Sequence, residues 1–137
     1  MRTFSKAYGL AGMRTGYGIS APELARTLWT MQLPFGTSAI SLAAVTASYE
    51  AEGQLQQRIR LITAERAYLR MRLRGLGVKS TASHANFVYL PSAGTPWSHV
   101  FDGTGLQVRS YADGAVRITV GNRRSTRAVV AAVKANI

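Results

Sequence analysis

The segment RTFSKAYGLAGMRTGYG, Arg2 to Gly18, is the most specific stretch of the chain. It places a single lysine, Lys6, among small residues, and an arginine, Arg14, follows eight positions later. Four glycines punctuate the segment from Gly9 onward, and this spacing predicts a loop with tight turns after the end of a short strand. Because its neighbours are small, a flat group could lie close to the backbone beside Lys6.

Lys6 is a candidate for covalent chemistry. A lysine whose amine is neutral adds to an aldehyde or ketone to form an imine, and burial or a neighbouring cation favours the neutral amine. Thr3 and Ser5 supply hydroxyl groups and Arg14 supplies a guanidinium fork, and these groups together are suited to holding a phosphate. A lone lysine is more commonly a solvated surface residue, but this setting favours the chemical interpretation.

The same residues resemble a known family. The run TFSKAYGLAG, Thr3 to Gly12, is similar to the pyridoxal-phosphate attachment signature of the class I/II aminotransferases, which are fold type I enzymes, and MRTGYG continues the match. Within the family it looks most like the histidinol-phosphate and aromatic amino acid aminotransferase branch. The resemblance implies that Lys6 forms the internal aldimine with pyridoxal 5′-phosphate and moves the proton of the substrate Cα. It also implies that Thr3, Ser5 and Arg14 hold the cofactor phosphate.

A second match lies near the other end of the chain. The run VRSYADGAVRITVG, Val108 to Gly121, resembles the small-domain segment of the same branch. The resemblance implies that Arg117 binds the substrate carboxylate, in a bidentate pair that would orient the Cα–H bond for cleavage. Arg109 resembles an accessory arginine that meets the other anionic group or the side chain of the substrate. Both residues could instead be ordinary surface arginines on strands.

The resemblance covers essentially the whole chain of 137 residues, but only the C-terminal part of the longer chains of the family. In those chains three cofactor contacts precede the lysine: an aspartate at the pyridinium nitrogen, an aromatic residue on the ring, and an asparagine near the cofactor oxygen. Only five residues precede Lys6 here. Met1 is therefore expected to stand at an interior position of a larger enzyme.

The hydrophobic pattern predicts a helix-rich first half and a mixed second half. Helices are predicted over 21–32, over 38–52 with Ser38 as cap, over about 54–73 with an end at 75–77, and over 125–137 with Ser125 or Thr126 as cap. Strands are predicted over 85–91, 106–111 and 115–121, with a short helix or loop over 94–105. With the resemblance, the expected fold class is α/β. A remnant of the large cofactor-binding domain of a PLP-dependent transferase would occupy residues 1–50. A small C-terminal α+β domain with a long leading helix would occupy 51–137.

The charge of the chain leaves two interpretations open. Lys and Arg number 17 against 6 Asp and Glu, a net charge of +11, and such an excess is typical of nucleic-acid-binding proteins. A coding bias toward arginine and alanine, or a missing acidic portion, also accounts for it. The arginines are scattered along the chain rather than clustered in consecutive runs. In and just after the predicted helix over 54–73, Arg66 interrupts the apolar stripe, whereas the other arginines occupy other faces, which favours a solvated face: Arg58, Arg60, Arg70, Arg72 and Arg74.

Composition excludes several classes of site. The absence of cysteine rules out disulfides and thiolate metal sites, and two histidines cannot form a three-histidine metal site, so no metal is expected. No apolar run approaches the length of a membrane span, and the first residues lack the apolar core of a signal peptide. A cytoplasmic protein with no membrane or nucleic-acid partner is expected.

Three hypotheses about function follow. The first is a PLP-dependent enzyme that transfers an amino group between an amino acid (aromatic, or histidinol phosphate) and a 2-oxo acid, and that is a homodimer in its full-length form. The second is a truncated, catalytically inactive aminotransferase fragment. The third, a basic nucleic-acid-binding domain, lacks any recognised binding motif. The isolated chain is expected to bind pyridoxal phosphate weakly and not to transaminate, since a partial α/β domain exposes sheet edges and apolar faces.

Overall fold

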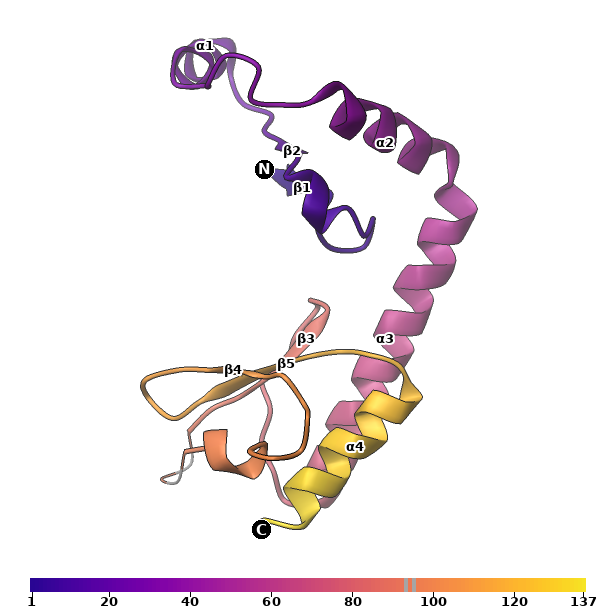
Figure 1. Cartoon of the computed structure of the whole chain (residues 1–137), viewed down its shortest axis with the longest axis vertical. Coiled ribbons are helices and arrows are strands. Elements are labelled where there is room, and N and C mark those ends of the chain that lie inside the picture. Colours follow the sequence, from indigo (N-terminus) through magenta and orange to yellow (C-terminus); the bar gives the residue numbers. More distant parts are fainter. Residues whose placement is uncertain (93, 95) are drawn as a thin grey trace. The chain divides into compact units, whose positions relative to one another are not determined.

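The computed structural model of the chain describes residues 1–92, 94 and 96–137 (Figure 1). The chain divides into two compact units, Met1–Arg58 and Ile59–Ile137, and each is described by itself. The helices are α1 (Pro22–Thr30), α2 (Ala39–Glu50), α3 (Glu52–Gly75) and α4 (Arg123–Lys134). The predicted division of the chain into domains at residue 50 stays a prediction.

The first unit contains the Gly-rich segment as a loop between two short paired strands. β1 (Arg2–Thr3) pairs antiparallel with β2 (Gly16–Tyr17), and a single 3-10 turn, η1 (Ala11–Met13), lies between them. The backbone of Gly9 has φ +76°, a left-handed conformation that glycine adopts without steric cost. The predicted loop with tight turns is confirmed, whereas the strand that follows it is limited to two residues.

An aromatic cluster holds this loop in the first unit. Phe4 is buried, and its ring centroid lies 4.9 Å from that of Tyr8, 5.9 Å from that of Tyr17 and 5.7 Å from that of Tyr49 on α2. Tilted and edge-to-face pairs at such distances are favourable. The loop residues next to Lys6 are thereby packed against α2.

The start of α2 provides a second tie to the loop. The Ser38 hydroxyl accepts a hydrogen bond from the Ser41 backbone N–H at 3.1 Å, so the predicted cap is confirmed. The Ser41 hydroxyl, which is buried, donates to the carbonyl of Met13 at 2.9 Å. The end of η1, next to Arg14, is therefore bonded to the first turn of α2.

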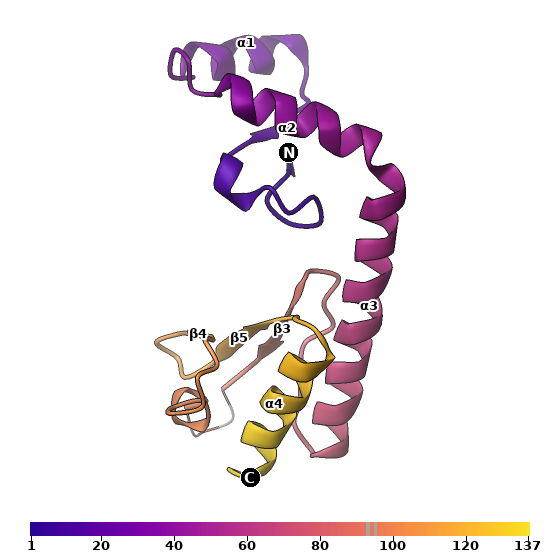
Figure 2. The same cartoon turned by 45° about the vertical axis from the view of Figure 1, so that its right-hand side comes forward.

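The second unit is built on a three-stranded antiparallel sheet. Its strands are β3 (Phe87–Leu90), β4 (Arg109–Ser110) and β5 (Val116–Thr119), in the order β3-β5-β4. Alternate side chains of β3 and β5 point into the core, where they pack with the buried faces of α3 and α4. That core includes Val88, Leu90, Val116, Ile118, Leu69, Leu73, Val129 and Val133. Figure 2 shows α4 running beside the C-terminal half of α3.

Glycine ends α3 where the sequence predicts it. The Val78 N–H donates to the Leu73 carbonyl at 3.0 Å and the Gly77 N–H donates to the Arg74 carbonyl at 2.9 Å, with Gly77 at φ +75°. This pair of bonds is the Schellman motif, which satisfies the last carbonyls of a helix.

Along the parts of the chain that the structure describes, no helix is both long enough and apolar enough to cross a membrane.

Two predicted elements differ from the structure, and a third, the short helix or loop expected over 94–105, agrees with it. The cap of the last helix is Asn122, whose side chain accepts from the Ser125 N–H at 2.9 Å, so a cap at Ser125 or Thr126 is wrong; asparagine caps as well as serine does. The strand predicted over 106–111 is reduced to β4. The stretch 94–105 contains one 3-10 turn, η2 (Ser98–Val100), and its residue 95 lies outside the described residues.

Gly114 provides a test of packing in the second unit. An alanine Cβ at Gly114 would lie 3.2 Å from the Pro96 Cα, with Gly114 at φ +83°; Gly103 has a similar φ of +70° but open space around it. We expect Gly114→Ala to destabilise the chain by about 1–3 kcal/mol more than Gly103→Ala, because only the former adds crowding to the left-handed strain. Urea unfolding followed by circular dichroism measures the difference, and equal effects would contradict the crowding argument.

Candidate functional site

Lys6 lies in the first unit at the turn that follows β1. Its carbonyl accepts a hydrogen bond from the Gly9 N–H at 2.9 Å, and the Leu10 N–H donates to the Phe4 carbonyl at 2.9 Å. The lysine side chain is exposed, whereas Phe4, two residues earlier, is buried. The backbone of the lysine is therefore held by a short turn and an aromatic anchor while its amine remains accessible.

The structure brings together three residues that the sequence proposes for a phosphate. Thr3, Ser5 and Arg14 all line one hollow of about 630 Å³ in the first unit. The Thr3 hydroxyl oxygen accepts the Ser5 N–H at 3.1 Å, so the backbone between these two residues is bent toward the hollow. Lys6 directly follows Ser5 in the sequence and is not among the lining residues.

The backbone at Arg14 is strained. This arginine has φ +50°, a left-handed conformation that costs a non-glycine residue roughly 1–2 kcal/mol and that concentrates at functional positions. Its Nη1 donates to the Ala11 carbonyl at 2.8 Å, which directs the guanidinium over η1. A guanidinium has five N–H donors, so this bond leaves others for an anion.

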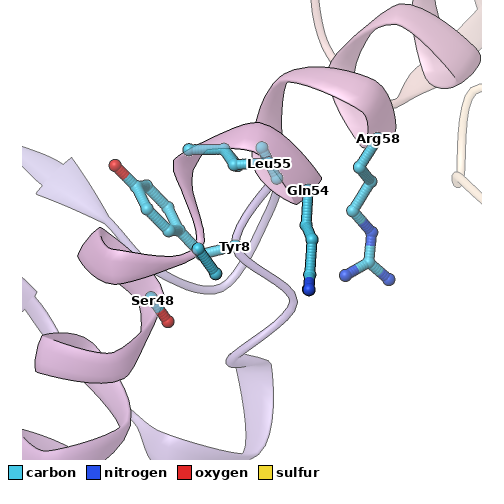
Figure 3. A pocket seen from close by; sticks show the side chains of 7 residues that line it. Tyr8, Ser48, Gln54, Leu55 and Arg58 are labelled. Carbon is cyan, nitrogen blue, oxygen red and sulfur yellow. The ribbon is translucent and has the colours of Figure 1, made fainter.

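A smaller hollow lies on the same loop and includes a residue that the sequence did not single out (Figure 3). It measures about 100 Å³ and is lined by Ala7, Tyr8, Ser48, Ala51, Gln54, Leu55 and Arg58. Figure 3 shows Gln54 and Arg58 projecting in parallel from α3. A Cβ on Gly9 would stand 2.5 Å from the Arg58 Nη1. Arg58 is exposed, as predicted for a solvated face, but its guanidinium also approaches the turn that follows Lys6, a contact that sequence periodicity could not reveal.

In the second unit, Arg117 and Arg109 face each other across the sheet. They are Cα partners on β5 and β4, and Tyr89 on β3 is the partner of Arg117 on its other side. Because paired residues project from the same side of a sheet, the two arginines share the face opposite to the buried Val116 and Ile118. Like charges placed directly opposite each other are destabilising, so this pair favours a bound anion.

The face around these arginines is aromatic. The Arg117 Cζ lies 4.9 Å from the Phe87 ring centroid and the Arg109 Cζ lies 5.6 Å from the Tyr111 ring centroid, distances typical of cation–π contacts. Burial, followed by the charge of Asp113, raises the pKa of Tyr89, which keeps its hydroxyl neutral. Arg117 is half-buried and its Nε forms no hydrogen bond within the described residues. This face combines cations with aromatic walls.

Known proteins that resemble this chain are all aminotransferases in the examples given next. Residues 1–133 match the aminotransferase class I and II family. The chain is 44% identical to histidinol-phosphate aminotransferase 2 of Caulobacter vibrioides, over 98% of this chain and 37% of that relative. It is 42% identical to the aromatic amino acid aminotransferase of Mycobacterium avium, over 88% of this chain and 35% of that relative. The chain thus spans little more than a third of the length of the curated relatives it matches.

Solved structures show the same likeness. Histidinol-phosphate aminotransferase from Sinorhizobium meliloti, solved in complex with pyridoxal-5′-phosphate, superposes with a TM-score of 0.80 at 26% identity, over 97% of this chain and 39% of that one. A putative histidinol-phosphate aminotransferase from Erwinia carotovora atroseptica superposes with a TM-score of 0.86 at 22% identity, over 97% of this chain and 40% of that one. The mixture of helices and strands described above is therefore the one found in these enzymes.

Proposed function

Because the chain belongs to the aminotransferase class I and II family, we propose that it provides the cofactor lysine and the substrate-binding arginine of a pyridoxal-phosphate-dependent aminotransferase. The reaction moves an amino group between an amino acid and a 2-oxo acid, and the donor is an aromatic amino acid or histidinol phosphate. The observation that supports this most directly is the single hollow that Thr3, Ser5 and Arg14 line, next to Lys6 in the sequence.

The residues present fit the cofactor phosphate. Two hydroxyls and a guanidinium form charge-assisted and neutral hydrogen bonds to phosphate oxygens. Gly16, which lines the same hollow, tolerates no side chain, since a Cβ there would stand 2.6 Å from the Arg2 carbonyl oxygen. In the proposal Thr3, Ser5 and Arg14 would bind the phosphate of the cofactor, and Lys6, the residue after Ser5, would supply the amine.

Lys6 has two roles in the proposal. Pyridoxal phosphate, when bound, supplies an electron sink for the charge that develops at the substrate Cα. The Lys6 Nζ would hold the cofactor and, when its amine is free, would take the proton from the substrate Cα as a general base. The turn and the Phe4 anchor hold the backbone of the lysine, so the amine moves while its attachment to the fold does not.

Arg117 binds the anionic group of the substrate in the proposal. That group is the carboxylate of an aromatic amino acid or the phosphate of histidinol phosphate, and an arginine fork matches both. The aromatic side chains on the same face, Phe87, Tyr89 and Tyr111, favour a donor with a ring. Arg109, opposite Arg117 on the sheet, is assigned to a second anionic group or the side chain of the substrate.

A chimera tests the proposed function in an assembled enzyme. In this chimera, residues 1–133 replace the matching segment of the Caulobacter vibrioides relative. We expect the purified chimera to bind pyridoxal phosphate and to transaminate an aromatic amino acid or histidinol phosphate with a 2-oxo acid. A folded chimera that binds the cofactor and transaminates neither donor would contradict the proposal. Its oligomeric state, expected to be a homodimer, is measured by light scattering on the same sample.

A substitution at Arg14 tests whether this residue binds the cofactor phosphate without also destabilising the fold. Arg14→Gly removes the guanidinium and also the left-handed strain at φ +50°, so the chimera should unfold no more easily than before. We expect its affinity for pyridoxal phosphate to fall by about tenfold or more, the loss of one charge-assisted contact. Fluorescence titration measures the affinity. Arg26→Gly, on an exposed helix position, is the control, and an equal loss there would refute the assignment.

A further inference from the structure

A cationic groove lies between α3 and α4 in the second unit. Tyr68, Arg72, Arg127, Val130, Ala131 and Lys134 line a hollow of about 200 Å³; we call it the α3–α4 groove. Three of these six residues are cations and none is an acid. None of them has a role in the proposed binding of cofactor or substrate.

The aromatic wall of the groove is held in place by arginines. The Arg72 Nη1 donates to the Tyr68 hydroxyl oxygen at 3.0 Å, and the Arg123 Cζ lies 3.7 Å from the Tyr68 ring centroid. Arg123 is itself fixed by the Glu65 carboxylate, to which its Nε donates at 3.0 Å. The hydrogen bond from Arg72, followed by the charges of Arg72, Arg123 and Arg127, lowers the pKa of Tyr68. The groove is thus preorganised and its potential is positive.

Within the described residues, none of the cations that line the groove forms an ion pair. The Glu65–Arg123 contact is the only ion pair within residues 1–92, 94 and 96–137, and it lies beside the groove rather than in it. Arg72, Arg127 and Lys134 thus concentrate positive charge along one hollow with no ion pair to any of them in that part of the chain. A bound anion would supply the missing counter-charge.

We propose that the α3–α4 groove binds a small organic phosphate. The two arginine forks match the oxygens of a phosphate monoester, and Lys134 adds a third positive charge for a dianion. The Tyr68 ring and the Val130 side chain provide an apolar wall for a short carbon skeleton. The hollow is smaller than the roughly 300–1,000 Å³ of sites for drug-sized ligands, so the ligand is a phosphate group with few carbon atoms.

Titration of the full chain followed by amide chemical shifts tests this site. The probes are inorganic phosphate and glycerol 3-phosphate, with acetate and a single-stranded oligonucleotide as comparisons. We expect saturable shifts at Tyr68, Arg127 and Ala131 with both phosphates, and the same shifts in the Arg14→Gly variant, which separates this site from the hollow of the first unit. Shifts confined to residues 3–16, or saturable binding of the oligonucleotide alone, would overturn the proposal.

Two double variants distinguish specific binding in the α3–α4 groove from non-specific attraction to the net positive charge of the chain. R127Q/K134Q removes two of the lining cations and is expected to weaken glycerol 3-phosphate binding by about tenfold or more. R60Q/K79Q removes the same net charge at exposed positions outside the groove, and we expect less than about a twofold change. Equal losses in the two variants would show non-specific attraction and would refute the site. The wild-type shift map decides the location even if a variant is poorly folded.

Discussion

Lys6→Ala in the chimera is expected to lower kcat by about 10²–10⁴-fold, the contribution of a positioned general base. The loss arises because the first unit contains no other lysine: within the transplanted residues 1–133 the one other lysine, Lys79, belongs to the second unit. The same variant should abolish the covalent label that borohydride reduction in the presence of pyridoxal phosphate leaves on the wild-type protein. Steady-state kinetics and peptide mapping measure the two effects.

Lys79→Ala is the matched control, since Lys79 is exposed and follows the end of α3. Its kcat and its labelling at Lys6 should match those of the unsubstituted chimera. Label spread evenly over Lys6 and Lys79 would contradict the assignment of Lys6. In the isolated 137-residue chain we expect weak binding of pyridoxal phosphate and no turnover, and measurable transamination by that chain would contradict this expectation.

Arg117→Ala is expected to lower kcat/KM by about 10²–10³-fold. Truncating one partner of a buried, hydrogen-bonded charge pair costs about 2–5 kcal/mol, and each 1.4 kcal/mol is about tenfold. Arg117 is the half-buried member of the arginine pair, and its Nε has no hydrogen bond within the described residues, so an anion is its natural partner. The effect is measured with an aromatic amino acid and with histidinol phosphate as donors.

Two further variants test why Arg117→Ala should lower kcat/KM. Arg117→Lys keeps the charge but removes the fork, so it should recover only part of the activity if bidentate binding matters. Arg109→Gln should have a smaller effect than Arg117→Ala, because Arg109 is exposed. An Arg117→Ala enzyme with an unchanged kcat/KM, or a larger loss at Arg109, would contradict the assignment of the substrate anion to Arg117.

Local sequence was sufficient for features that depend on a few neighbouring residues. The motif around Lys6 indicated the family, which the comparisons confirm. The Ser38 cap and the glycine end of α3 were predicted, because one hydroxyl or one left-handed residue decides whether a helix begins or ends there. The N-cap of α4 was placed wrongly, since Asn122, Ser125 and Thr126 are all acceptable caps and the choice depends on how the first turn, with its buried Thr126, meets the core.

Sequence alone left the partners of most charged residues undetermined. Arg58 was predicted on a solvated face and is exposed, but the sequence did not indicate that its guanidinium approaches Gly9, about fifty positions away. The sequence also did not indicate that Arg123 pairs with Glu65, nearly sixty positions earlier, and covers the Tyr68 ring. Helical periodicity reports which face of a helix is apolar and not which distant segment covers it.

The sequence by itself determined the identity and spacing of the reactive groups: a lysine with two hydroxyls and an arginine around it, and a second arginine on a later strand. These residues are close in the sequence, so any structure that keeps the conformation of this loop also keeps their relative positions. Only the tertiary structure decided that Thr3, Ser5 and Arg14 line one hollow, that Arg109 lies opposite Arg117, and that cations gather between α3 and α4. Those arrangements depend on strand register and on helix packing, which burial of the whole core sets and no short segment encodes.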